Sequence, residues 1–121
     1  MSRIMLVEDD AFVREDLRQE MVEAQHEVVV HEGGHAAMAT ILSNPPQFIV
    51  TDIIMEEGEG MDLIAKARAA CPDAILIAIS SNTKYLEYAA ALGAHHTMLK
   101  PLKGRDLVEA IAGLSQQATA V

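Results

Sequence analysis

Four charged side chains each stand at the end of an apolar run of strand length: Glu8, Asp9, Asp52 and Lys100. If these runs are neighbouring parallel strands, the carboxylates and the ammonium group converge at one edge of the sheet. Carboxylates that are crowded together repel one another, and a divalent cation neutralises that repulsion. The pattern therefore predicts a phosphoryl-transfer site built around one aspartate, Asp52.

The elements that must position these groups alternate along the chain. The predicted strands are 4–7, 28–31, 48–51, 75–79 and 97–99, and the predicted helices are 11–25, 34–43, 60–71, 83–92 and 104–114. The strand runs are continuously apolar, which is typical of a parallel sheet that is buried on both faces. This alternation implies right-handed crossovers with helices on both faces, an α/β doubly wound (βα)5 fold.

Local signals mark several element ends. Asp10 is placed to cap the helix 11–25, and Gly93 is placed to end the helix 83–92. The apolar side of the helix 11–25 is expected to carry Phe12, Leu17, Met21 and Val22. The tail 115–121 is small and polar and is expected to fray.

The composition excludes several classes of function. A net charge of −9 and a pI near 4.8 argue against direct binding to nucleic acid or to an anionic membrane surface. No apolar run is long enough to span a membrane, and the first residues lead directly into a strand without a secretory signal. The single cysteine, Cys71, cannot form an internal disulfide, which suits a reducing cytoplasm. We therefore expect a cytoplasmic protein.

Four short segments, in order, resemble the receiver domain of two-component response regulators. They are 6–10 (LVEDD), 51–55 (TDIIM) with Gly60 and Leu63 downstream, 79–81 (ISS) and 99–101 (LKP). The resemblance covers essentially the whole chain. It implies a flavodoxin-like three-layer sandwich with a five-stranded parallel sheet, forming a single receiver domain over 1–121.

The resemblance also implies a role for each matched residue. Asp52 would be the nucleophile that accepts a phosphoryl group from a histidine kinase or a histidine phosphotransfer protein. Mg²⁺ would be held by Glu8, Asp9, Asp52 and the backbone carbonyl of Ile54. Lys100 would place its charge against the phosphoryl oxygens, and Ser80 would donate its hydroxyl to one of them. The Lys100–Pro101 bond resembles a cis peptide of the family.

Three positions depart from the family pattern. Glu56 replaces a usual proline and begins the acidic run Glu56-Glu57-Gly58-Glu59, which raises the cost of adding a phosphoryl group. Thr97 stands where receivers commonly carry an aromatic reporter of the switch. Ile54 offers no side-chain hydrogen bond to orient a water molecule, so we predict slow self-dephosphorylation.

Histidines and tyrosines outside these segments have plainer explanations. His31, His35 and the pair His95-His96 invite a metal interpretation, but the adjacent pair points in two directions and is expected to lie solvated in a turn. Tyr85 and Tyr88 could partly compensate for Thr97, although their spacing is that of packing residues.

The resulting hypothesis is a stand-alone receiver whose phosphorylation switches a surface that binds a downstream protein, which the sequence does not identify. Self-catalysed phosphoryl transfer and autodephosphorylation are expected, without turnover as an enzyme. A haloacid-dehalogenase-like phosphatase would need an aspartate where Ile54 stands. The serious rival is a pseudo-receiver that serves as a docking module without being phosphorylated, supported by Glu56 and Thr97.

Overall fold

The computed structural model describes residues 1–55 and 60–119, and in this part of the chain five strands alternate with five helices. The strands are β1 (Arg3–Val7), β2 (Glu27–His31), β3 (Phe48–Asp52), β4 (Ile75–Ser80) and β5 (His96–Leu99). The helices are α1 (Ala11–Glu23), α2 (Gly34–Ile41), α3 (Gly60–Ala70), α4 (Thr83–Leu92) and α5 (Gly104–Thr119). All neighbouring strands are parallel, in the order β2-β1-β3-β4-β5. The predicted doubly wound fold is confirmed.

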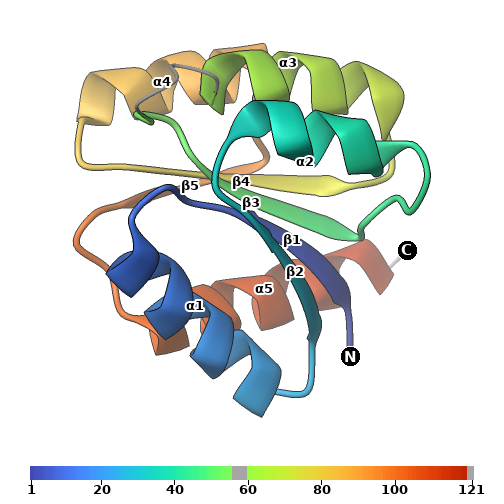
Figure 1. The fold of residues 1–121 in the computed structure, drawn as a ribbon, viewed down its shortest axis with the longest axis vertical. Helices are drawn as coiled ribbons and strands as arrows, with labels where there is room; N and C mark the ends of the chain where they lie inside the picture. The colour runs from blue at the N-terminus through green and yellow to red at the C-terminus, as the bar shows by residue number, and fades with distance from the viewer. Residues whose placement is uncertain (56–59, 120–121) are drawn as a thin grey trace.

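The sheet lies between two layers of helices, with α1 and α5 on one face and α2, α3 and α4 on the other (Figure 1). Each face has its own apolar core. Leu17 of α1 and Ile111 of α5 pack against one face of the strands, and Leu63 of α3 and Ala89 of α4 pack against the other. No described helix is long and apolar enough to cross a bilayer.

The ends of two helices follow the sequence signals. The Asp10 carboxylate accepts hydrogen bonds from the N–H groups of Phe12 and Val13, at 2.9 and 3.2 Å, so it caps α1 as predicted. Gly93 ends α4 with a φ of 126°, a left-handed conformation that glycine adopts without strain. Asn82 caps the start of α4, which the sequence analysis did not predict.

The predicted apolar face of α1 is wrong at two positions. Leu17 and Met21 are buried, whereas Phe12 is 91% exposed and Val22 is 44% exposed. Leu17 and Met21 are four residues apart and therefore lie on one side of a helix, whereas Phe12 lies five residues before Leu17 and points away from it.

The edge strand β2 and the last helix also differ from expectation. The burial on both faces that was predicted for every strand fails at β2, where Val29 and Val30 are exposed, because β2 has a neighbour on one side only. Helix α5 continues to Thr119, past the predicted end at Leu114, and neither Gly nor Pro interrupts 115–119.

Candidate functional site

The candidate site lies at the carboxyl ends of the strands, where the order of the strands reverses between β1 and β3. Asp52 is the last residue of β3 and is buried, with 6% of its surface exposed. Glu8 and Asp9 directly follow β1, Ser80 is the last residue of β4, and Lys100 follows β5. Ligands bind at this place in open α/β sheets.

The ammonium group of Lys100 joins two buried carboxylates. Its Nζ atom lies 2.6 Å from Oε1 of Glu8 and 2.9 Å from Oδ2 of Asp52. The backbone N–H of Lys100 donates to the carbonyl oxygen of Ser80 at 2.9 Å, which fixes the start of this side chain beside β4. A carboxylate that is removed from water needs such a partner, so one ammonium group compensates two buried negative charges.

The pKa values of Glu8 and Lys100 are both raised, for different reasons. Burial raises the pKa of Glu8 to about 7, and the hydrogen bonds from Lys100 and from the N–H of Asp10 only partly offset it. Burial also opposes the charge of Lys100, but its hydrogen bonds to Glu8 and Asp52 outweigh this and raise its pKa. The site therefore holds Glu8 near the point at which it loses its proton.

The same carboxylates form a set that suits a hard cation. Ligand oxygens of Glu8, Asp9 and Asp52 all lie within 4.8 Å of one another, the one such cluster of three in residues 1–55 and 60–119. Glu8 and Asp52 are buried, whereas Asp9 is exposed. All three donors are oxygens, which Mg²⁺ and Ca²⁺ prefer, so the donor set fits the predicted ion.

Two further predicted residues lie at this edge with local roles of their own. The N–H of Ile54 donates to Oδ1 of Asp52 at 3.3 Å, and 48% of the Ile54 surface is exposed. Ser80 is buried, and its hydroxyl oxygen accepts the N–H of Asn82 at 3.1 Å. Ser80 thereby links the end of β4 to the cap of α4.

Gly60 is required by the close approach of α3 to the end of β3. A Cβ atom at this position would lie 2.5 Å from the carbonyl oxygen of Asp52 and 2.6 Å from Cα of Ile53. These contacts are with backbone, which cannot rotate aside as a side chain could. The absence of a side chain at Gly60 therefore lets α3 begin directly against the residues that carry the site.

Arg14 is a site residue that the sequence analysis missed. Its Nη1 atom donates to the backbone carbonyl of Glu8 at 2.9 Å, and its Nη2 atom lies 3.7 Å from Oε1 of Glu32. One side chain thus ties α1 to the loop that carries the carboxylates and to the loop after β2. Arg14 lies one turn after the Asp10 cap, from where a long side chain can reach back to the loop. This position was the sequence signal that could have identified it.

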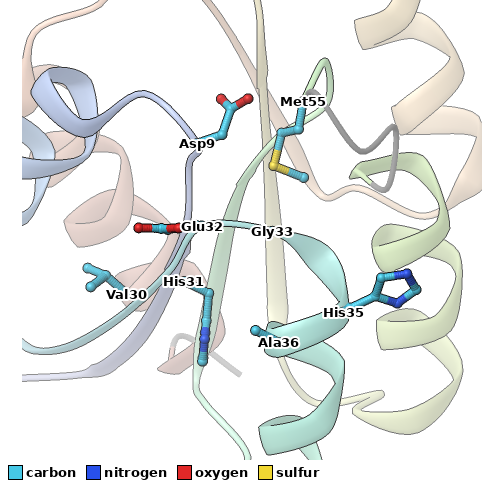
Figure 2. Close-up of a pocket in the computed structure, with 8 residues that line it drawn as sticks. All are labelled: Asp9, Val30, His31, Glu32, Gly33, His35, Ala36 and Met55. Atoms are coloured by element: carbon cyan, nitrogen blue, oxygen red, sulfur yellow. The ribbon is translucent and has the colours of Figure 1, made fainter.

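A hollow of about 620 Å³ opens beside the exposed member of the carboxylate cluster (Figure 2). Its lining residues come from the ends of β1, β2 and β3 and the start of α2: Asp9, Val30, His31, Glu32, Gly33, His35, Ala36 and Met55. Figure 2 shows Asp9 at one margin, near Met55, and the His35 ring directed toward α3. The hollow gives ions and donor groups from solution access to Asp9.

The histidines do not join the carboxylates. No histidine belongs to the one candidate metal cluster of the described residues. His31 lies 3.2 Å from the Thr40 hydroxyl, and Nδ1 of His95 accepts the N–H of Leu76 at 2.9 Å. The solvated turn predicted for these two histidines is confirmed for His95, which is exposed in the bend before β5, and is wrong for His96, which is half-buried and begins β5.

Two of the departures from the family pattern can be placed as follows. Thr97 lies half-buried in β5, paired with Ala78 of β4, and Glu56 lies outside the described residues.

The two tyrosines of α4 are both exposed. Tyr85 and Tyr88 are 41% and 52% exposed, with ring centroids 6.4 Å apart. The Lys100–Pro101 bond is cis, as the resemblance implied.

Comparison with known proteins gives a consistent result. The model of the family described as "Response regulator receiver domain" matches residues 4–112. Response regulator MprA of Mycolicibacterium vanbaalenii is 27% identical over 119 residues, which are 97% of this chain and 52% of that protein. Transcriptional regulatory protein PdtaR of Mycobacterium tuberculosis is 32% identical over 113 residues, 90% of this chain and 54% of that protein. The chain thus spans about half the length of these curated relatives.

Solved structures show the same fold. A CheY-like receiver domain protein from Methanospirillum hungatei has a TM-score of 0.91 at 23% identity, covering 98% of this chain and 96% of that one. The chemotaxis response regulator CheY4 of Vibrio cholerae has a TM-score of 0.86 at 19% identity, covering 94% of this chain and 98% of that one.

Proposed function

This chain belongs to the response regulator receiver domain family of two-component systems, and on that premise we propose that it accepts a phosphoryl group on Asp52. The family is a signalling module rather than a class of turnover enzymes. The observation that carries the proposal is the pairing of Asp52 and Glu8 with Lys100, beside Asp9, at the carboxyl edge of the sheet.

The proposed reaction uses the Asp52 carboxylate as nucleophile. One carboxylate oxygen attacks the phosphorus of a phosphohistidine, the P–N bond breaks, and the imidazole leaves with the bonding electron pair. The product is an acyl phosphate on Asp52. Lys100 already lies 2.9 Å from Asp52, so its positive charge is in place to offset the phosphoryl oxygens.

Glu8, Asp9 and Asp52, with the backbone carbonyl of Ile54, would hold Mg²⁺ in this proposal. A bound Mg²⁺ supplies positive charge that offsets the charge on the transferred phosphoryl group. Three carboxylates against one ammonium leave an excess of negative charge at the site, which supports a need for a further cation.

Ser80 and Lys100 would read the phosphorylated state. The Ser80 hydroxyl would donate to a phosphoryl oxygen, while its oxygen contacts the N–H of Asn82 at the start of α4. A change at Ser80 is thereby connected to α4, which packs against β4 and β5. We propose that the donor is a histidine kinase or a histidine phosphotransfer protein, and that the altered surface binds a downstream protein.

The test is the intact mass of the protein after incubation with acetyl phosphate, with and without Mg²⁺. One phosphoryl adduct that requires Mg²⁺ and disappears in Asp52→Asn is expected. Asp73→Asn is the matched control, because Asp73 is an exposed carboxylate at the opposite end of the sheet. This control should still form the adduct.

The opposite result identifies the rival function. If no adduct forms where a known receiver is modified, the protein is a pseudo-receiver that docks without phosphorylation. Glu56→Pro and Thr97→Tyr would then test whether those two departures removed the activity. An adduct that persists in Asp52→Asn would place the modification on another residue and overturn the assignment of Asp52.

A further inference from the structure

The outer edge of β2 is an open strand edge. β2 stands at one end of the strand order, with β1 on one side and no described strand on the other. Val29 is 40% exposed and Val30 is 37% exposed. Successive side chains of a strand point to opposite faces, so both helix layers leave the edge uncovered.

The backbone of β2 presents hydrogen-bonding groups outward at alternate residues. The N–H of Glu27 donates to Ser2 at 2.9 Å, and the carbonyl of His31 accepts the N–H of Glu8 at 3.1 Å, so these residues turn toward β1. By alternation, the N–H and C=O groups of Val28 and Val30 turn away from the sheet. They form a template for one more strand.

The sequence of this edge is complementary to itself when read in the opposite direction. Residues 26–32 read His-Glu-Val-Val-Val-His-Glu. An antiparallel copy that is centred on Val29 places valine opposite valine at three positions and histidine opposite glutamate at the other four. β-branched cross-strand pairs stabilise antiparallel strands, and placing an imidazole opposite each glutamate keeps two glutamates from facing each other.

We propose that β2 pairs with β2 of a second copy of this chain, in antiparallel register about a two-fold axis at Val29, to form one continuous ten-stranded sheet. In this register Val28 faces Val30 of the second copy and exchanges both hydrogen bonds with it. The same patch serves both partners, as closed dimer symmetry requires.

Other antiparallel registers use the edge less well. Only Val28 and Val30 offer outward backbone groups within the strand, so one copy can slide along the other only in steps of two residues. Each such step moves the two-fold axis by one residue. Centring the pair on Val30 places Val28 opposite Glu32 and Val29 opposite His31. The register about Val29 is the one that matches every valine with a valine and every glutamate with a histidine.

The edge also lacks the usual protection against pairing. Edge strands commonly carry lysine, proline or a bulge that prevents association. Residues 27–31 contain neither lysine nor proline, and their register with β1 is continuous from Arg3–Glu27 to Val7–His31. The net charge of −9 on each copy opposes association at low salt, so tests belong near physiological ionic strength.

A cysteine at the two-fold axis tests the register directly. At Val29 the two Cα atoms would be about 4.5 Å apart in a non-hydrogen-bonded pair, which suits a disulfide. In a Cys71→Ala background, Val29→Cys should form a disulfide-linked dimer under mild oxidation. Val30→Cys is the matched control, because its own copy would lie about 7–8 Å away on the diagonal.

Sedimentation equilibrium tests association of the unmodified chain. The parent protein should dimerise with rising concentration, and Val29→Lys should weaken the dimer by about tenfold or more because two lysines would face each other at the axis. Val29 is exposed, so the variant should fold, which circular dichroism checks. A parent chain that stays monomeric to about 1 mM, or cross-linking of Val29→Cys no faster than of Val30→Cys, would overturn the proposal.

Discussion

The two ends of the parallel sheet use polar side chains in opposite ways. At the amino end, neutral groups close the starts of strands. Nδ1 of His26 accepts the N–H of Ser2 at 3.0 Å, and Nδ1 of His95 accepts the N–H of Leu76 at 2.9 Å. At the carboxyl end, charged side chains crowd together, and Lys100 bridges Glu8 and Asp52.

The difference separates stability from chemistry. Burial lowers the pKa of His26 and of His95, so the amino end keeps neutral rings whose nitrogens satisfy backbone groups. Burial raises the pKa of Glu8 to about 7, so the carboxyl end holds a group that is costly to ionise. Crowded, buried charges that lower stability indicate a ligand-binding site at the carboxyl end.

The largest expected effect is the removal of the ammonium at the carboxyl end. Lys100→Met should lower the free energy of unfolding at pH 8 by about 2–3 kcal/mol, less than for a fully buried pair because Lys100 is partly exposed. Urea unfolding measures it, and Lys84→Met on the exposed face of α4 is the control. An equal, small loss in both variants would show that the bridge contributes nothing.

Removing a carboxylate from the same end should have the opposite sign. Because the pKa of Glu8 is raised from 4.5 to about 7, the folded state binds this proton more tightly, and stability falls as pH rises through that window. Glu8→Gln should therefore be about 2 kcal/mol more stable than the parent at pH 8 without Mg²⁺. The difference in free energy of unfolding between Glu8→Gln and the parent should become smaller toward pH 5. A difference that does not change with pH would contradict the raised pKa of Glu8.

The contact of α3 with β3 predicts a smaller loss that is confined to the site. Gly60→Ala forces a Cβ atom against the backbone of Asp52 and should cost about 1–2 kcal/mol and slow phosphorylation. Gly113→Ala is the matched control, because nothing lies within 4 Å of its Cβ position in α5 and alanine favours a helix there. The comparison fails if both alanines stabilise the protein and leave acetyl phosphate labelling unchanged.

Substitutions at the amino end of the sheet should change stability least, and their effect should depend on pH in the acidic range. His95→Leu leaves the N–H of Leu76 without its acceptor, which should cost about 1 kcal/mol at pH 7.5. Burial, with a contribution from Arg68, lowers the pKa of His95, so its stabilisation is present above pH 6.5 and is lost as pH falls below it. The difference in free energy of unfolding between His95→Leu and the parent should become smaller by pH 5.5. His96→Leu is the control for the loss of an imidazole.

Much of the fold and of the candidate site could be predicted from local patterns. All five predicted helices begin where α1 to α5 begin, and every predicted strand bound lies within one residue of the structure. The larger differences are at helix ends and are largest at the end of α5. The apolar runs placed Glu8, Asp9, Asp52 and Lys100 at one edge, and the structure brings them together there. The exposure of Phe12 follows from its helical spacing to Leu17. The partners of Arg14 depend on how α1 is placed against the two loops, which local patterns do not set.

The sequence by itself determined the order and type of the elements and the residues at the strand ends, because period, caps and breakers act over a few neighbouring positions. Only the tertiary structure decided which charges share a partner. Lys100 and Glu8 are 92 positions apart, and their 2.6 Å contact exists because parallel pairing aligns the ends of β1, β3, β4 and β5. It also decided that β2 lies at an edge, since the position of a strand in a sheet depends on all the others.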